Sequence, residues 1–312
     1  MTGDAPSPAR VADLSVRDFE ERLATGIGVG IGPFAAFLSV DVPQLAAKLH
    51  ALYRDYPLID DDNVFSFHAR LEQRRSVPGI GRRLVRFSVD GRVPHEDMPF
   101  EQALPVLEWG INLVIALRSH SFMMLHSAVV ELDDAAMLLP AAPGAGKTTL
   151  CAGLTLAGWR LFSDEFGLIR PGTRELIPVP RPLALKNQSI DVIRGFDPEA
   201  YIGPKTPGTR KGTVAHLRPP SRSIRLADRP APARHIVFPR WREGAPSTLT
   251  EIPKGDAFML LATNAFNYDL LGEPGFESVR LLIDGARCLE FEYSDLDNAV
   301  PALTDFVRRD DL

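Results

Sequence analysis

The residues with the clearest chemical meaning form the string AAPGAGKTT, which begins at Ala141. It fits the phosphate-loop pattern G-x-x-x-x-G-K-[ST], except that Ala141 stands at the first glycine position. Gly144 and Gly146 leave room for backbone N–H groups to wrap around phosphate oxygens. Lys147 is expected to contact the β and γ phosphates, and the Thr148 hydroxyl to ligate Mg²⁺. The sequence therefore predicts an ATP and Mg²⁺ site whose loop residues are Pro143, Gly144, Ala145, Gly146, Lys147, Thr148 and Thr149.

The segments on either side of this string support the same interpretation. Residues 122–132 and 135–142 are apolar and are separated by Asp133–Asp134, a pattern typical of a hairpin that runs straight into the loop. After the loop, Leu150 and Leu154 give a helical apolar face. A phosphate bound by the loop would lie at the N-terminus of that helix.

An acidic pair, Asp164 and Glu165, follows the loop closely. It ends an apolar strand that contains Leu161 and Phe162, and the interval after Lys147 has room for only one short helix. The chain should therefore return both carboxylates to the side of the phosphate loop. One could hold Mg²⁺ while the other accepts the proton of an attacking hydroxyl. The alternative is that the two carboxylates only end a strand in solvent.

These residues resemble the carboxy-terminal catalytic domain of HPr kinase/phosphorylase, a bacterial serine kinase whose core is related to PEP carboxykinase. The matching landmarks, in chain order, are LHSAVVEL with His126, PGAGKTT, the G-W-R-L stretch at 158–161 and Asp164–Glu165. The similarity covers residues 120–185 well and residues 235–267 weakly. It implies a P-loop kinase domain with a mixed sheet, in which Asp164 is the catalytic base and Glu165 lies next to the metal.

The resemblance also places His126 beside the active site, although a histidine on an apolar strand is more often a buried structural residue. Ser127 stands where the family usually has glycine, and no glycine-rich string like E-I-R-G-L-G follows downstream. That string is associated with dephosphorylation, so the resemblance implies a kinase only. The pattern is most similar to HPr-kinase-related proteins with peptide or small-protein substrates.

Several basic residues beyond the loop are further candidates for binding anionic oxygens. Arg181, Lys186 and Asn187 leave a predicted strand near the site, and could equally be a solvated strand end. Residues 203–227 contain six Lys or Arg and no Asp or Glu, and we expect them to form a mobile lid. Lys205, Arg210 and Lys211 would then close over the nucleotide.

Composition limits the remaining function classes. The net charge of −5 argues against broad nucleic-acid binding, and the two cysteines argue against a disulfide framework or a metal cluster. No signal-peptide pattern or uninterrupted membrane-spanning run is found, so we expect a cytoplasmic protein with no membrane partner. The resemblance allows a homo-oligomer, of which the sequence itself carries no sign.

The expected organisation is α/β throughout. Residues 1–95 are predicted to form a small α/β domain of unknown role, and residues 96–312 the kinase domain, with a helix at 98–117 leading into it. Three functions remain open: transfer of the ATP γ-phosphoryl group to a Ser or Thr of a peptide or small protein, a small-metabolite kinase, and a nucleotide-dependent switch without an acceptor. The absence of an N-K-x-D string disfavours a GTPase form of the switch.

Overall fold

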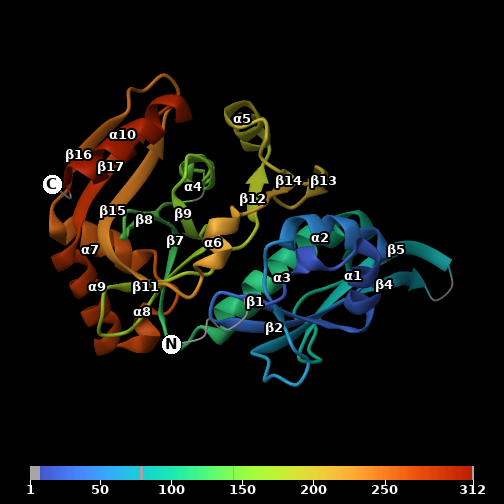
Figure 1. The fold of residues 1–312 in the computed structure, drawn as a ribbon. Coiled ribbons are helices and arrows are strands. Elements are labelled where there is room, and N and C mark those ends of the chain that lie inside the picture. Colours follow the sequence, from blue (N-terminus) through green and yellow to red (C-terminus); the bar gives the residue numbers. More distant parts are fainter. Residues whose placement is uncertain (1–7, 78–79, 143, 311–312) are drawn as a thin grey trace, which may run out of the picture.

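A computed structural model describes residues 8–77, 80–142 and 144–310 of the chain. It shows a mixed α/β protein with three sheets, in which an amino-terminal unit lies beside a larger unit that carries the phosphate-loop segment (Figure 1). The mixed α/β fold class predicted from the sequence is therefore observed.

The amino-terminal unit is a six-stranded sheet in the order β3-β1-β2-β4-β5-β6, covered by helices. Its elements are α1 (Val16–Thr25), β1 (Ile27–Ile31), β2 (Phe34–Asp41), α2 (Ala46–Tyr53), β3 (Leu58–Ile59), β4 (Phe67–Val77), β5 (Ile80–Val89), β6 (Met98–Pro99) and α3 (Ala103–Arg118). The sequence predicts helices at 15–24 and 41–54 and strands at 64–71 and 83–90, which correspond to α1, α2, β4 and β5, whereas it does not predict β1 and β2. Gly28 and Gly30 alternate with apolar residues in β1, where their small size admits Ile59 and Pro57 from the neighbouring segment.

The amino-terminal unit continues past the predicted boundary at residue 95. β6 pairs with β5, and α3 packs its apolar face on β4 and β5 rather than on the second unit alone. Leu107 and Ile111 of α3 are fully buried in the same core as the sheet residues Leu71 and Phe87, and this core also includes Phe166 and Leu168 of the second unit. The sheet and its covering helix thus end at Arg118.

The second unit is built on an eight-stranded sheet in the order β11-β10-β7-β8-β15-β17-β16, with β9 attached to β7. Its strands are β7 (Met123–Leu132), β8 (Ala135–Pro140), β9 (Arg160–Ser163), β10 (Phe166–Ile169), β11 (Glu175–Ile177), β15 (Ala231–Trp241), β16 (Thr248–Glu251) and β17 (Arg287–Tyr293). The predicted hairpin is confirmed: Asp133 and Asp134 both have positive φ, as a two-residue turn requires. β15 runs parallel to both β8 and β17.

Helices cover this sheet on the sides that would otherwise expose its apolar residues (Figure 1). They are α4 (Lys147–Leu156), α7 (Lys254–Thr263), α8 (Tyr268–Leu271), α9 (Glu273–Gly285) and α10 (Leu296–Asp310). α4 and α10 share one core with β8, β15 and β17, while α7 and α9 share another with the opposite sheet face. The sequence predicts helices from the loop to about Ala157, near 276–285 and at the carboxy-terminal end to about Arg309, and α4, α9 and α10 agree with these within a few residues.

The prediction of a mobile lid at 203–227 is wrong. This segment forms β13 (Thr206–Thr209), β14 (Gly212–Leu217) and α6 (Ser221–Arg225), and β14 pairs in register with β12 (Leu183–Lys186). Ala215 and Leu217 are fully buried, so the segment has an apolar face that its basic residues concealed. Lys205 is paired with Asp191 of α5 (Gln188–Phe196), a helix the sequence did not predict.

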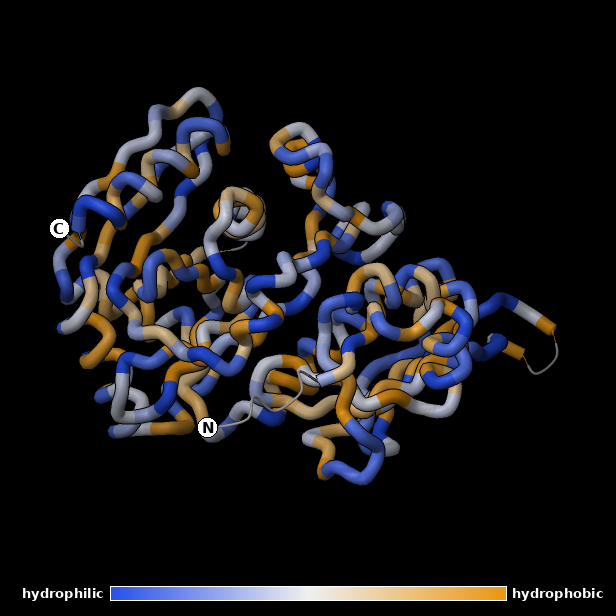
Figure 2. Tube along the Cα trace, in the orientation of Figure 1, coloured by the Kyte–Doolittle hydropathy of each residue, from blue (hydrophilic) through white to orange (hydrophobic). Residues whose placement is uncertain are grey.

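Hydrophobic segments gather on the strands of the larger unit, whereas the arms of the projecting β4–β5 hairpin are mostly hydrophilic (Figure 2). The helical segment Phe100–Arg118 is the one described stretch that is long and apolar enough to cross a membrane by length and composition. However, 61% of its apolar window is buried inside the protein, as in a core helix.

Candidate active site

The strands of the second unit bring the predicted site residues to one edge of the sheet. β8 and its parallel neighbours β15 and β17 all end at this edge, with Trp241 and Tyr293 as the last residues of β15 and β17. β9 is antiparallel to β7, as β8 is, so β9 ends there too and is followed by Asp164. Ligands in open α/β sheets bind beyond the carboxyl ends of the strands.

The phosphate-loop segment connects the end of β8 to the start of α4 through two glycines with left-handed backbone. Gly144 has φ +91° and Gly146 has φ +87°, conformations that other residues adopt only with strain. The loop is held from its far side: Trp241 N donates to Ala145 O at 3.1 Å, and the Tyr293 hydroxyl donates to Gly146 O at 3.0 Å. Neighbouring strands therefore hold the backbone of Ala145 and Gly146 in place.

A cavity of about 480 Å³ opens between this loop and the neighbouring sheet edge. It gathers most of the residues predicted from the sequence, because the described residues lining it include His126, Gly144, Gly146, Lys147, Thr148, Thr149, Glu165, Lys186 and Lys211. Three lysines and one carboxylate face the same space, so its electrostatic character suits a polyanion.

Lys147 has no hydrogen-bond partner in the described part of the chain, although its ammonium nitrogen is inaccessible to solvent. Burial lowers the pKa of Lys147, and the carboxylates of Asp164 and Glu165 partly oppose that change. A buried cation without a partner costs free energy, and an anionic ligand in the cavity would remove that cost.

Asp164 and Glu165 occupy a tight turn in which they point to different environments. The Ser163 hydroxyl accepts hydrogen bonds from the backbone N–H groups of Glu165 (3.2 Å) and Phe166 (2.9 Å), which holds the turn. Glu165 lines the cavity, whereas Asp164 is only 8% exposed. Burial, and then the charge of Glu165, raise the pKa of Asp164 to about 7, against the lowering effect of Lys147 and of a hydrogen bond with the Thr148 hydroxyl.

These two carboxylates therefore differ in environment, since Glu165 faces the cavity and Asp164 is buried. A carboxyl group with a pKa near neutrality is suited to accept a proton, because it can change charge at working pH. The Oδ1 atom of Asp164 is inaccessible to solvent and lacks a hydrogen-bond partner within the described residues, and Asp164 itself does not line this cavity.

His126 lies on β7 at the cavity wall, opposite Phe166 of β10. Its ring is 5.6 Å from the ring of Phe266, and its backbone N–H donates to Asn264 O at 2.7 Å. Burial and the nearby charge of Lys147 lower the pKa of His126, with Glu165 opposing. His126 is therefore a neutral ring at pH 7, suited to hydrogen bonding rather than to charge neutralisation.

Pro143 falls outside the described residues. Some other sequence candidates do not line the cavity, among them Arg210, which is exposed in the β13–β14 turn. Arg181 is buried, where it pairs with Glu108 and donates to Asn112 Oδ1 at 2.7 Å, so it links α3 to the second unit instead of clamping phosphate. Ala145 contributes its backbone, through the bond with Trp241.

Two lining residues were missed by the sequence analysis, namely Ala184 of β12 and Ser189 of α5. No local signal marks them, because β12 and α5 reach the cavity through long-range packing against α4. Lys211 lies in the turn between β13 and β14 of the same small sheet, β12-β14-β13. Its ammonium lies 5.4 Å above the ring of Trp109 in α3. The amino-terminal unit thus supports one of the cavity's lysines.

The residues at the cavity fit Mg²⁺ bound together with phosphate rather than a separate metal cluster. Among the described residues no group of three or more His, Cys, Asp and Glu could hold a metal ion. Mg²⁺ commonly takes one or two protein ligands and fills its remaining positions with phosphate oxygens and water. Thr148, Asp164 and Glu165 could supply such a partial ligand set.

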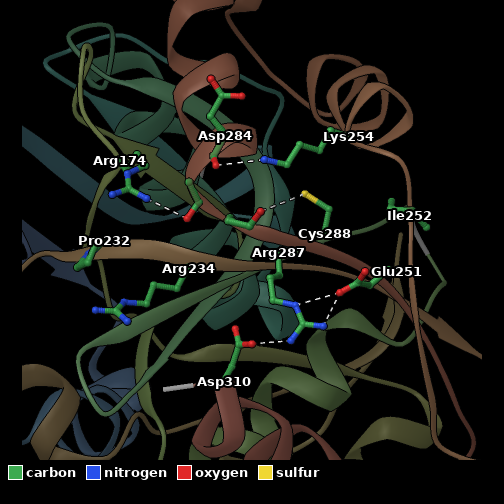
Figure 3. A pocket seen from close by; sticks show the side chains of 12 residues that line it. Arg174, Pro232, Arg234, Glu251, Ile252, Lys254, Asp284, Arg287, Cys288 and Asp310 are labelled. Carbon is green, nitrogen blue, oxygen red and sulfur yellow. Dashed lines mark hydrogen bonds and ion pairs between the residues drawn. The ribbon is translucent and has the colours of Figure 1, made fainter. Parts of the chain in front are cut away.

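A larger cavity, of about 610 Å³, lies elsewhere, around Arg287 and the end of α10 (Figure 3). Its charged groups are largely satisfied by the protein itself: Arg287 pairs with Glu251 and Asp310, while Arg174 and Lys254 donate to backbone oxygens of α9. Burial also raises the pKa of Cys288 there to about 11, so this thiol is a poor nucleophile. Size alone therefore does not make this cavity the reactive site.

No family model matches the chain, and no curated protein does. Among solved structures, the chain is similar to the Hpr(Ser) kinase/phosphatase from Coxiella burnetii, at 10% sequence identity, covering 60% of this chain and 94% of that chain. The TM-score is 0.26, which is too low for the match to carry an argument about fold or function.

Proposed function

We propose that this chain is an ATP-dependent phosphotransferase that moves the γ-phosphoryl group of Mg-ATP to a hydroxyl group. The observation that carries the proposal is the buried Lys147 ammonium, which has no hydrogen-bond partner among the described residues and lies at the start of α4 beside two left-handed glycines. Phosphate oxygens would give this lysine its missing acceptors. They would also lie at a helix N-terminus, where anions are favoured.

The chain's own residues then have separable tasks. Gly144, Gly146 and Lys147 would hold the β and γ phosphates, while Thr148 and Glu165 would hold Mg²⁺. When bound, Mg-ATP supplies the transferable phosphoryl group and a leaving ADP. Asp164 accepts the proton of the acceptor hydroxyl as the new O–P bond forms, and its pKa of about 7 suits that step.

The rim of the cavity adds charge and orientation. Lys186 and Lys211 enter from the β12–β14 sheet and would neutralise charge on the transferring group. His126, neutral at pH 7, would donate or accept a hydrogen bond at the same place. The acceptor class, a Ser or Thr of a peptide or small protein, rests on the sequence resemblance alone.

The experiment compares the parent with Lys147→Ala, using labelled-phosphate transfer from ATP to a panel of Ser-containing peptides, proteins and small alcohols. Lys205→Ala is the matched control, because Lys205 is half-exposed, pairs with Asp191 and does not line the cavity. We expect the rate of phosphoryl transfer to fall at least about 100-fold in Lys147→Ala, because the variant lacks a group that stabilises negative charge in the transition state. Lys205→Ala should keep parental transfer.

Two results would count against the proposal. Parental transfer by Lys147→Ala would remove the loop from the mechanism. ATP binding by the parent without labelling of any acceptor would instead favour the nucleotide-dependent switch. Labelling of small alcohols but of no peptide or protein would favour the small-metabolite kinase.

A further inference from the structure

A second, smaller cavity adjoins the far side of the phosphate-loop segment. Its volume is about 270 Å³, and it shares Gly144, Gly146, Thr149 and Ser189 with the larger cavity described above. The remaining described residues around it are Gln188, Val192, Trp241, Tyr293, Ser294, Asp295 and Leu296. We call this space the aromatic slot. A molecule bound by the loop could therefore extend directly into it.

One wall of the aromatic slot carries Trp241, a large apolar side chain that is 47% exposed. Its orientation is fixed at both ends: the backbone N–H binds Ala145 O, and the indole Nε1 donates to Ser294 O at 2.8 Å. An exposed tryptophan held in one orientation has already lost the rotamer freedom that binding would otherwise remove. It offers a flat, rigid surface for a ring.

The other wall comes from α5, which stands across α4 from the start of α10 (Figure 1). Val192 of α5 is 39% exposed and lines the slot, which gives this wall an apolar face as well. Gln188, Ser189 and Ser294 add amide and hydroxyl groups at the edges. Two apolar walls with polar groups at the edges match the faces and edges of a heteroaromatic base.

The packing at Gly146 fixes the distance between slot and loop. A Cβ atom at Gly146 would lie 2.9 Å from the Trp241 Cβ and 2.3 Å from the Tyr293 hydroxyl oxygen. Trp241 and Tyr293 are thus in contact with Gly146 of the loop. A single nucleotide could therefore reach from the loop to Trp241.

We infer that the aromatic slot is the base subsite of the nucleotide, with the base stacked on Trp241 and facing Val192. This inference rests on the proposed function, since the triphosphate must occupy the loop for its base to reach the slot. It assigns to Trp241 a binding role that extends beyond the phosphate-loop motif and the acidic pair.

Calorimetric titration of Mg-ATP and of Mg-tripolyphosphate separates the two sites, because only ATP carries a base. The proteins are the parent, Trp241→Ala, Trp241→Phe and the control Phe276→Ala, which removes an aromatic residue of similar exposure (49%) on α9. We expect Trp241→Ala to weaken Mg-ATP binding about 10- to 100-fold, as removal of a base-stacking ring does. Tripolyphosphate affinity should stay unchanged, and Trp241→Phe should keep most of the ATP affinity.

Tryptophan fluorescence provides a second readout without destabilising substitutions. Mg-ATP, but not Mg-tripolyphosphate, should change the emission of the parent, and Trp241→Phe should lose this difference. The base subsite would be overturned if Trp241→Ala lost affinity equally for Mg-ATP and Mg-tripolyphosphate. It would also be overturned if the variant lost affinity for neither ligand. If the parent binds neither ligand, the proposed function itself fails, and the base subsite falls with it.

Discussion

Replacing Asp164 by asparagine should stabilise the ligand-free protein at pH 8 while slowing phosphoryl transfer. Burial is the largest cause that raises the pKa of this carboxyl group from 3.8 to about 7. The unfolded chain releases the proton near pH 4, whereas the folded protein keeps it until about pH 7. Between these values the folded state binds more protons, so the free energy of unfolding falls as pH rises and does not recover above pH 7.

The magnitude follows from the size of this shift, which is about 3 pH units, at about 1.4 kcal/mol per unit. The buried carboxylate therefore lowers the free energy of unfolding at pH 8 by at most about 4 kcal/mol. An uncharged asparagine would remove this destabilisation. The net gain is smaller, because Asp164 also attracts the buried Lys147 and that attraction is lost. We expect Asp164→Asn to raise the free energy of unfolding by about 1–3 kcal/mol at pH 8. At pH 4.5, where Asp164 is protonated in the folded state, the increase should be about a quarter of that.

Urea denaturation of the ligand-free parent and variant at pH 4.5, 6 and 8 measures this difference. The control is Asp191→Asn, since the pKa of that exposed carboxyl is lowered by its hydrogen bond from Lys205 and its loss should not stabilise the protein. In the same variant, transfer should fall about 10²–10⁴-fold, the usual contribution of a positioned base. Equal stability of Asp164→Asn and the parent at all three pH values would refute the raised pKa, and parental transfer would refute the base.

Three further predictions follow from single contacts. Glu165→Gln should weaken the Mg²⁺-dependent part of ATP affinity, because an amide is a poorer Mg²⁺ ligand than a carboxylate. Titrations of ATP with and without Mg²⁺ measure this part of the affinity. If Mg²⁺ increases ATP affinity as much in the variant as in the parent, Glu165 is not a metal ligand. Gly146→Ala should lose at least about tenfold in Mg-ATP affinity, since its Cβ would meet Tyr293, whereas Gly144→Ala, with similar φ but open space, should lose less. Glu108→Gln should lower the free energy of unfolding by about 3–5 kcal/mol, because it leaves the buried Arg181 guanidinium uncompensated; a loss below about 1 kcal/mol in urea denaturation would show that the pair is not needed.

Local patterns allowed the sequence to predict the elements around the phosphate loop. The hairpin 122–142, the glycine-rich segment and the helix after Lys147 each follow from neighbouring residues: alternating apolar runs, a two-residue aspartate turn, and small residues where the backbone needs positive φ. The return of Asp164 and Glu165 to the loop also followed from a short interval with room for one helix. These inferences needed no knowledge of long-range pairing.

Other segments were misread because their local composition concealed a buried face. The many basic residues of 203–227 indicated a mobile lid, but β14 gains order from its pairing with β12, a contact with a segment some thirty residues earlier. The helix predicted at 98–117 was expected to lead into the kinase domain. In the structure α3 packs on β4 and β5 and shares its core with β10 of the second unit as well.

The sequence by itself determined that the loop and the acidic pair lie close together, because the short interval between them has room for only one helix. Only the tertiary structure decided which distant residues join them. Trp241 and Tyr293 are separated from the loop by about a hundred residues or more, and they reach it because β8, β15 and β17 are parallel and end at one edge. Burial raises the pKa of Asp164, and this burial also depends on the tertiary structure, because β9, α4 and β12 pack together at this place. Spacing along a chain fixes neighbours within one element, whereas strand order and burial depend on the whole sheet.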